Sequence, residues 1–453
     1  MFYKPLRVPN GSSQVRLSEL VAAFSYALDL TEGQPAGHSV RCCWIGSQIG
    51  RALGLDAQEQ SELYYALLLK DLGCSSNAAR ICELYEADDL AFKRGYKTVG
   101  TSLAASVRFV VSKTARNAPW HERTARIGRI LRDGPELSRQ LIVARCTRGA
   151  DIARELRFSD AVCAGIFHLD EHWDGSGKPD GVRGDAIPLF SRIALLAQVA
   201  DVFHRHAGAH AAVEEVRRRA GTWLDPELVR LFENLANDRT FWMILESPAI
   251  EVHLAAFAPH ERTRPVDDNY LDSIAAAFGQ VIDAKSPYTA GHSQRVAELA
   301  NRIAGTLGVP ANRRRQVRRA ALLHDIGKLG VSNTILDKPA ALDEAEWATM
   351  RDHASHTREI LARVGVMADL ADIAAAHHER LDGAGYPLGL ADAEIARETR
   401  IITVCDFFDA LTADRPYRAA MDTPAALAVI QGEVGKAIDG ECLEALRQVI
   451  RAI

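Results

Sequence analysis

The feature that most constrains this chain is an internal repeat at a fixed spacing. The run A-G-H-S at residues 36–39 recurs at residues 290–293, and the run L-G-L at 53–55 recurs as L-G-V at 307–309, each pair 254 positions apart. Self-similarity at one offset is the sign of a duplicated structural unit. The chain is therefore predicted to fold as two similar domains in tandem.

The offset between the two copies becomes smaller further along. The run D-G-S-G-K-P at residues 174–179 answers D-G-A-G-Y-P at 382–387, which is an offset of 208. We matched Asp201 with Asp406 at an offset of 205. The first copy therefore carries about 46 extra residues, which we expect near residues 83–133.

The domain boundaries follow from the repeat and from chain breakers. Proline, glycine and mixed charges cluster between the copies and indicate a connection. The predicted organisation is a first domain at residues 1–250, a linker at 251–265 and a second domain at 266–453. Helical spacing of Ala, Leu and Arg recurs throughout, with an amphipathic helix expected at residues 17–30, and two-residue alternation is scarce. The predicted fold class is all-α.

The second copy contains a concentration of histidine and aspartate. His324 and Asp325 follow an apolar run, and Lys328 comes four residues after His324. On a continuous helix, residues four apart lie on the same face, so the imidazole and the ammonium would point into one space. A lone His-Asp dipeptide is more often a solvated pair at the end of a buried helix. The residues downstream change this interpretation.

Further candidate metal ligands appear at intervals in the same copy. His377 and His378 are followed at once by a glycine-rich loop, and Asp406 lies on an otherwise apolar helix, where an unpaired charge would be costly. His292 stands at a predicted helix start, and His353 lies within a predicted helix. Neutral imidazole and carboxylate are common ligands of first-row metals, so we expect a metal centre.

At this point the second copy resembles the HD-GYP branch of the HD metal-dependent phosphohydrolases. The resemblance covers roughly residues 270–453 and rests on the order and spacing of His292, H-D-I-G-K (324–328), His353, H-H-E (377–379), G-A-G-Y-P (383–387), Asp406 and R-P-Y-R (415–418). It implies two tandem HD-type helical bundles, iron or manganese ions, and hydrolysis of cyclic di-GMP to pGpG, GMP or both. The implied metal ligands are His292, His324, Asp325, His353, His377, His378 and Asp406.

The resemblance also implies how the site would work. Asp325 would bridge two metal ions, and a shared water would be acidified enough to attack phosphorus as hydroxide. Lys328 would hold a phosphate oxygen as charge builds, which makes Asp325 and Lys328 the predicted catalytic pair. Arg415 and Arg418, three residues apart, are expected to contact substrate phosphate, although an exposed basic turn is the alternative.

The loop residues Gly385, Tyr386 and Pro387 are the other predicted substrate contacts. Tyr386 could stack on a guanine or shape a surface for a protein partner, and the sequence leaves both open.

Two departures from the family pattern affect these expectations. Tyr288 stands where members with three metals carry a glutamate, so we predict two ions, iron or manganese. The segment after His353 lacks the usual proline and glycine, and His356 becomes a competing ligand, although a surface histidine is favoured.

The first copy lacks most of this set of residues. Lys70 replaces His324, Cys74 replaces Lys328, and Leu169-Asp170 replaces the two adjacent histidines. An ammonium at Lys70, between Asp71 and Asp201, could satisfy the carboxylates that a metal would otherwise neutralise. We therefore expect a non-catalytic copy with a structural or dimerising role, in preference to ligand sensing.

Composition limits the classes of partner. The net charge of −5 gives no global field that favours a DNA or RNA polymer, and no run of 18 apolar residues predicts a membrane span. Eight cysteines without metal-like spacing indicate reduced thiols and a cytoplasmic location. The expected partner is a cyclic dinucleotide, and a homodimer or a protein partner at the G-Y-P loop is compatible with the sequence.

Three functions follow from these observations. The leading hypothesis is a metal-dependent cyclic di-GMP phosphodiesterase. The alternatives are a cyclic dinucleotide receptor or scaffold without activity, and a phosphohydrolase of the same type that acts on another nucleotide, because a metal centre alone does not fix the leaving group.

Overall fold

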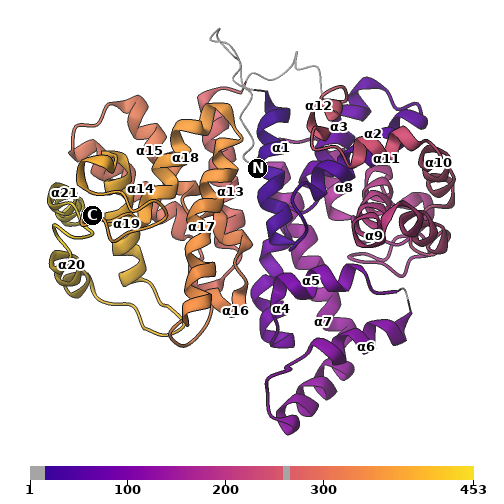
Figure 1. Cartoon of the computed structure of the whole chain (residues 1–453), viewed down its shortest axis with the longest axis horizontal. Helices are drawn as coiled ribbons and strands as arrows, with labels where there is room; N and C mark the ends of the chain where they lie inside the picture. Colours follow the sequence, from indigo (N-terminus) through magenta and orange to yellow (C-terminus); the bar gives the residue numbers. More distant parts are fainter. Residues whose placement is uncertain (1–15, 101, 259–265, 453) are drawn as a thin grey trace. The chain divides into compact units, whose positions relative to one another are not determined.

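The computed structural model describes residues 16–100, 102–258 and 266–452. Within these residues the chain forms helices joined by turns and no β-strand (Figure 1). The α-helices are α1 (Leu17–Thr31), α2 (His38–Ala52), α3 (Ala57–Leu69), α4 (Ala78–Tyr85), α5 (Asp89–Lys97), α6 (Leu103–Lys113), α7 (Trp120–Glu155), α8 (Asp160–Phe167), α9 (Leu189–Arg218), α10 (Pro226–Ala236), α11 (Arg239–Leu245), α12 (Ile250–Leu254), α13 (Asp268–Asp283), α14 (His292–Thr306), α15 (Ala311–Leu323), α16 (Asn333–Leu336), α17 (Glu344–Ala362), α18 (Ala368–Ala375), α19 (Arg397–Thr412), α20 (Thr423–Gly432) and α21 (Gly440–Arg451). The all-α prediction is confirmed, and α1 spans the helix expected at residues 17–30.

The chain divides into two compact units. The N-terminal unit runs from Phe24 to Thr263, and the C-terminal unit runs from Arg264 to the end of the chain and includes the start of α1 up to Ala23. In the predicted linker, residues 251–254 belong to α12, and residues 259–265 lie outside the described part of the chain.

The C-terminal unit is a bundle in which α14 packs against α15, α19 and α21, while α18 packs against α15 and α17. Aspartates fix where its helices begin. The Asp343 carboxylate accepts a hydrogen bond from the Glu346 N–H, and the Glu346 carboxylate accepts one from the Asp343 N–H, which forms a capping box at the start of α17. The Asp439 carboxylate caps α21 by accepting from the N–H groups of Glu441 and Cys442. These caps set the rotational position of the side chains further along each helix.

The N-terminal unit repeats several of these local contacts. Here α2 packs against α3, α9 and α10. A glycine in the left-handed region precedes both α2 and α14, with φ of 81° at Gly37 and 70° at Gly291. Ser39 donates from both its N–H and its hydroxyl to Asp29, as Ser293 does to Asp283.

Residues 83–133, where the extra residues were expected, contain the end of α4, all of α5 and α6, and the first part of α7. An aromatic cluster joins these helices: the ring centroids of Tyr85 and Phe92 lie 4.1 Å apart, and those of Phe92 and Phe109 lie 5.2 Å apart. From α5, the Lys93 ammonium donates to the carbonyl oxygens of Thr31 at 3.2 Å and Cys74 at 2.7 Å. The segment is thereby fastened to its own unit.

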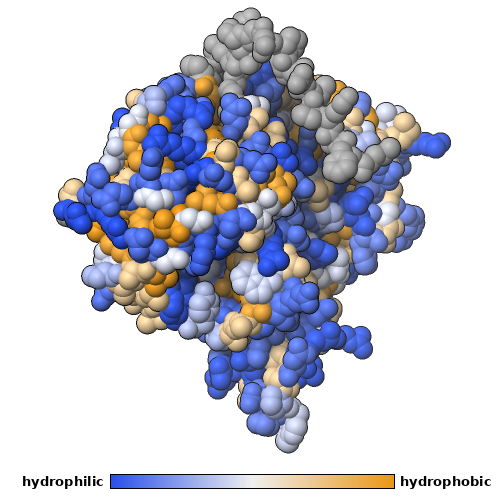
Figure 2. Space-filling view, turned by 60° about the vertical axis from the view of Figure 1, so that its left-hand side comes forward, coloured by the Kyte–Doolittle hydropathy of each residue, from blue (hydrophilic) through white to orange (hydrophobic). Residues whose placement is uncertain are grey.

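The face drawn in Figure 2 is a mosaic of hydrophilic residues and separate apolar patches. In the described part of the chain, no helix combines the length and apolar character needed to span a membrane. All eight cysteines are free thiols, and seven of them are buried.

Candidate metal centre

The His-Asp dipeptide lies where α15 ends. The helix stops at Leu323, His324 is its C-cap, and a 3-10 turn follows at residues 326–330. The expectation that His324 and Lys328 share a face of one continuous helix is therefore wrong. The chain turns because it passes very close to α17: a Cβ atom at Gly327 would lie 1.9 Å from the His353 carbonyl oxygen, so only glycine fits.

Thr357 ties this turn to α17. Its hydroxyl donates to the His324 carbonyl oxygen at 3.0 Å and accepts from the Gly327 N–H at 3.0 Å. The residue stands where the family pattern has glycine, and its hydroxyl fixes the HD segment relative to His353. Sequence reasoning treated this substitution only as a departure and missed that role.

Three of the predicted ligands form a first group: His292, His324 and Asp406. The Nε2 atom of His292 lies 3.4 Å from Nε2 of His324 and 3.4 Å from Oδ1 of Asp406. Both imidazoles also face Oδ2 of Asp325, at 3.6 Å from His292 and 3.4 Å from His324.

The other four predicted ligands form a second group: Asp325, His353, His377 and His378. The Oδ1 atom of Asp325 lies 3.6 Å from Nε2 of His353 and 3.6 Å from Nε2 of His377. Asp325 thus presents one carboxylate oxygen to each group, which is how a carboxylate bridges two ions. Neither group includes the competing candidate His356.

The imidazole rings are held from behind by hydrogen bonds. The Nδ1 atoms of His324, His353 and His377 each face a carbonyl oxygen three residues earlier, at 2.7, 2.5 and 2.7 Å respectively. An Nδ1–H that donates to a carbonyl leaves Nε2 as a lone pair directed into the site. His292 is oriented differently, because its Nδ1 lies 2.7 Å from Oδ2 of Asp409.

Burial and charge set the protonation states. Burial lowers the pKa of His324 to about 4 and the pKa of His353 to about 3, so both rings are neutral at pH 7. Burial would raise the pKa of Asp325, but His324 and Lys328 hold that pKa well below its usual range. For His292, burial lowers the pKa, yet Asp325 and Asp409 raise it to about 9. The cluster therefore offers neutral imidazoles at His324 and His353 and an ionised carboxylate at Asp325, whereas Asp325 and Asp409 hold a proton on His292 that a metal cation would replace.

These residues fit a pair of metal ions. Oδ1 of Asp325 and the Nε2 atoms of His353 and His377 are buried without a hydrogen-bond partner within the described residues. A buried acceptor without a donor is costly, and a cation removes that cost. Nitrogen and oxygen donors without a thiolate suit iron or manganese better than a closed structural zinc site.

Lys328 and Tyr386, two of the predicted substrate contacts, lie beside the metal ligands. Nζ of Lys328 donates to Oδ2 of Asp325 at 2.6 Å and remains partly exposed. The Tyr386 ring lies 4.8 Å from the His378 ring, centroid to centroid. Next to it, a Cβ at Gly385 would lie 2.5 Å from Cα of Glu379, so this position also requires glycine.

The loop that carries Gly385, Tyr386 and Pro387 is held by Glu379. Its buried carboxylate accepts from the N–H groups of Leu388 at 2.6 Å and Leu390 at 2.9 Å. Sequence reasoning used Glu379 only as part of a motif. The structure shows that it shapes the loop beside the second group.

The two arginines predicted to contact phosphate differ in their surroundings. The Arg418 guanidinium donates to the carbonyl oxygens of Ala410 at 2.7 Å and Leu411 at 2.9 Å, near the end of α19. A joint grip of one phosphate by both side chains does not match this arrangement, because main-chain carbonyls already engage Arg418. Arg415 pairs with Arg418 through the backbone, and no hydrogen bond of its guanidinium to another described residue is seen.

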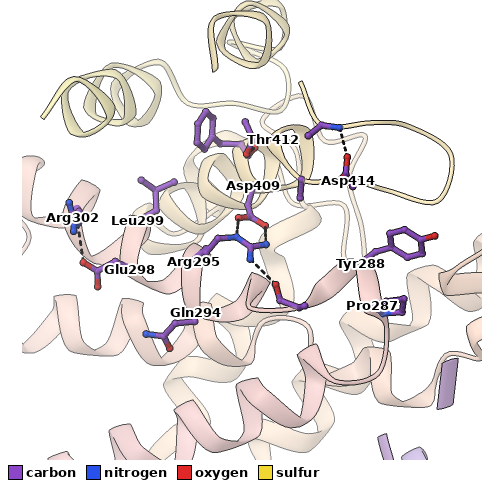
Figure 3. Close-up of a pocket in the computed structure, with 14 residues that line it drawn as sticks. Pro287, Tyr288, Gln294, Arg295, Glu298, Leu299, Arg302, Asp409, Thr412 and Asp414 are labelled. Carbon is purple, nitrogen blue, oxygen red and sulfur yellow. Dashed lines mark hydrogen bonds and ion pairs between the residues drawn. The ribbon is translucent and has the colours of Figure 1, made fainter. Parts of the chain in front are cut away.

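Sequence reasoning also missed Asp409 and Arg295. Figure 3 shows Arg295 and Asp409 facing each other at the wall of a pocket of about 970 Å³. Nε of Arg295 donates to Oδ1 of Asp409 at 2.6 Å, and a second N–H donates to Oδ2 at 3.0 Å. Tyr288 lines the same pocket. One feature of the sequence pointed to Asp409, because it lies three residues after Asp406 and therefore on the same side of α19.

The equivalent place in the N-terminal unit holds a lysine. The Lys70 ammonium pairs with Asp71 and lies 3.1 Å from Nε2 of His38. It does not lie between Asp71 and Asp201 as expected. Asp201 instead accepts from Nδ1 of His38 at 2.6 Å and from Nε of Arg41 at 2.6 Å.

The predicted match of Asp201 with Asp406 is therefore wrong. Asp201 makes the contacts that Asp409 makes, at an offset of 208, and Gln198 stands at the position of Asp406. The same offset places Arg145 at the position of His353. A Cβ at Gly73 would lie 1.8 Å from the Arg145 carbonyl oxygen, as one at Gly327 would approach His353.

Comparison with known proteins agrees with this geometry. A profile of the HD domain matches residues 135–228 and 277–442. A 3'3'-cGAMP-specific phosphodiesterase of Vibrio cholerae is 53% identical over 437 residues, which cover 96% of this chain and 95% of that protein. The chain belongs to the HD domain family. The G-Y-P loop beside His378 places it in the HD-GYP branch.

The chain is also similar to a second curated protein and to a solved structure. A cyclic di-GMP phosphodiesterase of Thermotoga maritima is 34% identical over 188 residues, which cover 41% of this chain and 51% of that protein. A crystal structure of a cyclic GMP-AMP specific phosphodiesterase from V. cholerae superposes with a TM-score of 0.67 at 46% identity, and covers 97% of this chain and 99% of that chain. HD phosphohydrolases depend on metal ions, and the two ligand groups described above are where this chain can hold them.

Proposed function

We propose that this protein is a metal-dependent phosphodiesterase that opens 3'3'-linked cyclic dinucleotides, with the C-terminal unit as its catalytic part. The observation that carries the proposal is the position of Asp325, whose two carboxylate oxygens face two separate groups of imidazoles. A carboxylate in this position can bridge two cations. The relatives named for cyclic dinucleotide hydrolysis support the choice of substrate class.

The residues of the chain divide the work of the reaction. When bound, the ions supply Lewis acidity and a reactive hydroxide from water at neutral pH. His292, His324 and Asp406 would hold one ion, His353, His377 and His378 the other, and Asp325 would bridge them. Nζ of Lys328 lies 2.6 Å from Oδ2 of Asp325, which places the ammonium where it can stabilise the negative charge that develops on a phosphate oxygen.

The loop at Tyr386 and the half-buried Arg415 complete the proposed substrate site. Tyr386 lies beside the second ligand group and offers a flat ring at its edge. Arg415 carries the guanidinium that we assign to a substrate phosphate, because the Arg418 guanidinium is engaged by carbonyl groups.

Among cyclic dinucleotides we propose 3'3'-cGAMP as the preferred substrate. The V. cholerae enzyme named for this specificity matches this chain along nearly the full length of both proteins. Cyclic di-GMP, the substrate first expected, is the second candidate, because relatives named for it match part of the chain. Rates on cyclic di-GMP, 3'3'-cGAMP and linear mononucleotides would rank these possibilities.

We further propose that the N-terminal unit binds no metal. Lys70, Gln198 and Arg145 replace His324, Asp406 and His353, and the Lys70 ammonium occupies the space beside Asp71 and His38. A fixed ammonium in that place satisfies the same carboxylate that a cation would.

The deciding experiment combines metal analysis with product analysis on the full chain, purified without oxygen. We expect about two iron or manganese ions per chain and consumption of 3'3'-cGAMP. The variants Asp325→Ala and His324→Ala should lose both properties, whereas Cys405→Ala, next to Asp406 but buried away from the site, should keep them. Two ions without turnover of any cyclic dinucleotide would overturn the proposed reaction, and no ion would favour a receptor.

A further inference from the structure

An exposed row of flat side chains leads away from the metal centre along α17. Trp347 is 44% exposed. Arg351 lies one helical turn later, and its guanidinium carbon is 5.8 Å from the centre of the Trp347 ring. The same carbon is 5.7 Å from the centre of the Tyr386 ring. The guanidinium thus lies between two aromatic rings from different segments of the chain.

The inner end of this row touches the metal ligands. The Tyr386 ring lies 4.8 Å from the His378 ring and 6.4 Å from the His353 ring, centroid to centroid. The order outward from the metal centre is therefore His378, Tyr386, Arg351 and Trp347. In a cyclic dinucleotide each base is joined to the phosphates through one ribose. A phosphate at the metals would place a base over the outer members of the row.

Arg351 has donors available for a ligand. Its side chain is exposed, and no carboxylate in the described part of the chain forms an ion pair with it. By contrast Arg358, two turns further along the same helix, is paired with Asp372 at 2.7 Å. A guanidinium that stacks on aromatic rings keeps its N–H edge free for hydrogen bonds in its own plane.

On these contacts, and building on the proposed phosphodiesterase function, we propose that Trp347, Arg351 and Tyr386 form a purine-binding subsite that prefers guanine to adenine. Aromatic and guanidinium planes accept any base by stacking. The preference comes from the edge of Arg351, since a guanidinium donates to both O6 and N7 of guanine, whereas adenine presents a donor at its 6 position. The subsite is a substrate contact on α17, a helix whose assigned role is to carry the ligand His353.

The test uses binding as well as turnover. Trp347 is the one tryptophan of six that lies beyond residue 242, so it can report on the C-terminal unit. The metal-loaded full chain would be titrated with phosphorothioate analogues of 3'3'-cGAMP, cyclic di-GMP and cyclic di-AMP, which resist hydrolysis. We expect quenching that disappears in Trp347→Phe. The matched control Trp120→Phe, exposed in the N-terminal unit, should keep it.

Two substitutions then separate stacking from base recognition. Trp347→Ala should weaken binding of all three analogues by about 5- to 150-fold, the usual value of one stacked base, and should raise KM more than it lowers kcat. Arg351→Gln should reduce the preference for cyclic di-GMP over cyclic di-AMP by about tenfold or more, because glutamine suits adenine. Arg358→Gln should change neither quantity, and all variants should melt like the parent because the side chains are exposed.

The outcomes distinguish the subsite from the enzyme. If the parent protein hydrolyses and binds a cyclic dinucleotide but Trp347→Ala and Arg351→Gln leave Kd and KM unchanged, the subsite is wrong and the proposed function stands. If Arg351→Gln weakens all three analogues equally, Arg351 contacts phosphate and the guanine preference is overturned. If the parent protein neither binds nor hydrolyses any of them, the proposed function itself fails.

Discussion

The two units solve the same electrostatic problem in different ways. In each, an aspartate lies buried at the end of a helix, beside a histidine that follows a left-handed glycine. In the N-terminal unit the neighbour of Asp71 is Lys70, whose ammonium pairs with it. In the C-terminal unit the neighbour of Asp325 is His324, which brings no fixed charge at neutral pH.

The difference shows what one residue decides. A lysine delivers its charge with the chain, so the buried carboxylate is satisfied as soon as the unit folds. With histidine in that place, Lys328 still pairs with Oδ2 of Asp325, but Oδ1 is left without a donor within the described residues. The same architecture then becomes a place for exchangeable ions. The residue before the buried aspartate, Lys70 or His324, should therefore decide whether a unit binds metal.

The largest effect should come from His324→Lys, which gives the C-terminal unit the residue of the N-terminal one. We expect turnover to fall by about 10⁴-fold, because the ammonium would displace an ion of the first group. The fold should survive, since Lys70 and Asp71 coexist in the other unit. Metal analysis and circular dichroism melting would check this, with Lys70→His as the matched control that should gain no activity. Retention of two ions by His324→Lys would contradict the comparison.

The next effect concerns stability in the N-terminal unit. Asp71→Asn would leave the fully buried Lys70 ammonium without its carboxylate, which should cost about 3–5 kcal/mol of unfolding free energy. Metal content and turnover per folded molecule should stay at the parent value. Urea unfolding followed by tryptophan fluorescence suits this test, because five of the six tryptophans lie in residues 44–242. A loss of bound metal in this variant would mean that the N-terminal unit holds an ion after all.

A smaller effect distinguishes the two histidine partners Asp409 and Asp201. Asp409→Asn should weaken metal binding about 10- to 100-fold, because the amide keeps one acceptor oxygen where His292 and Arg295 now use two. Asp201→Asn makes the same change beside His38 and Arg41, and should leave metal affinity unchanged. Competition with a metal-binding dye would measure both. Equal losses in the two variants would remove the distinction.

The smallest effect is a dependence of stability on pH. Burial would raise the pKa of Asp201, but His38 and Arg41 hold it at about 2, below the value of 3.8 for a free aspartate. The unfolded chain therefore takes up this proton first as pH falls. The stabilisation, at most about 2 kcal/mol, is present above pH 4 and is lost between pH 4 and pH 2. Urea unfolding should show this loss in the parent and a shallower one in Asp201→Asn; identical slopes would rule the contribution out.

Much of the metal centre could be predicted from sequence, because ligand chemistry depends on residue type and His and Asp are rare on apolar helices. All seven predicted ligands lie in the two groups. The hydrogen bonds that orient these ligands could not be predicted in the same way. Asp409 and Thr357 act through partners that are distant in the chain, and the short spacing of Asp409 from Asp406 does not by itself reveal which residue it orients.

The errors have physical causes as well. The helix through His324 looked continuous because its residues are good helix formers, yet the approach of α17 at Gly327 ends it. The match of Asp201 to Asp406 failed because two aspartates three residues apart are nearly equivalent in sequence, while only one of them faces the histidine Nδ1. Fold class was easier to predict, since it depends on a periodicity that many residues share.

Three imidazoles at the metal centre, those of His324, His353 and His377, are oriented by hydrogen bonds to main-chain carbonyl oxygens. The carbonyl groups belong to Ala321, Met350 and Ala374. A carbonyl group belongs to every residue, so substitution of those three side chains cannot delete the support as long as the helices persist. The orientation of these ligands is therefore robust to mutation. Of the four ligand imidazoles whose Nδ1 contact is described, His292 is the one that depends on a side chain, Asp409, and changes in metal affinity among descendants of this sequence should concentrate there.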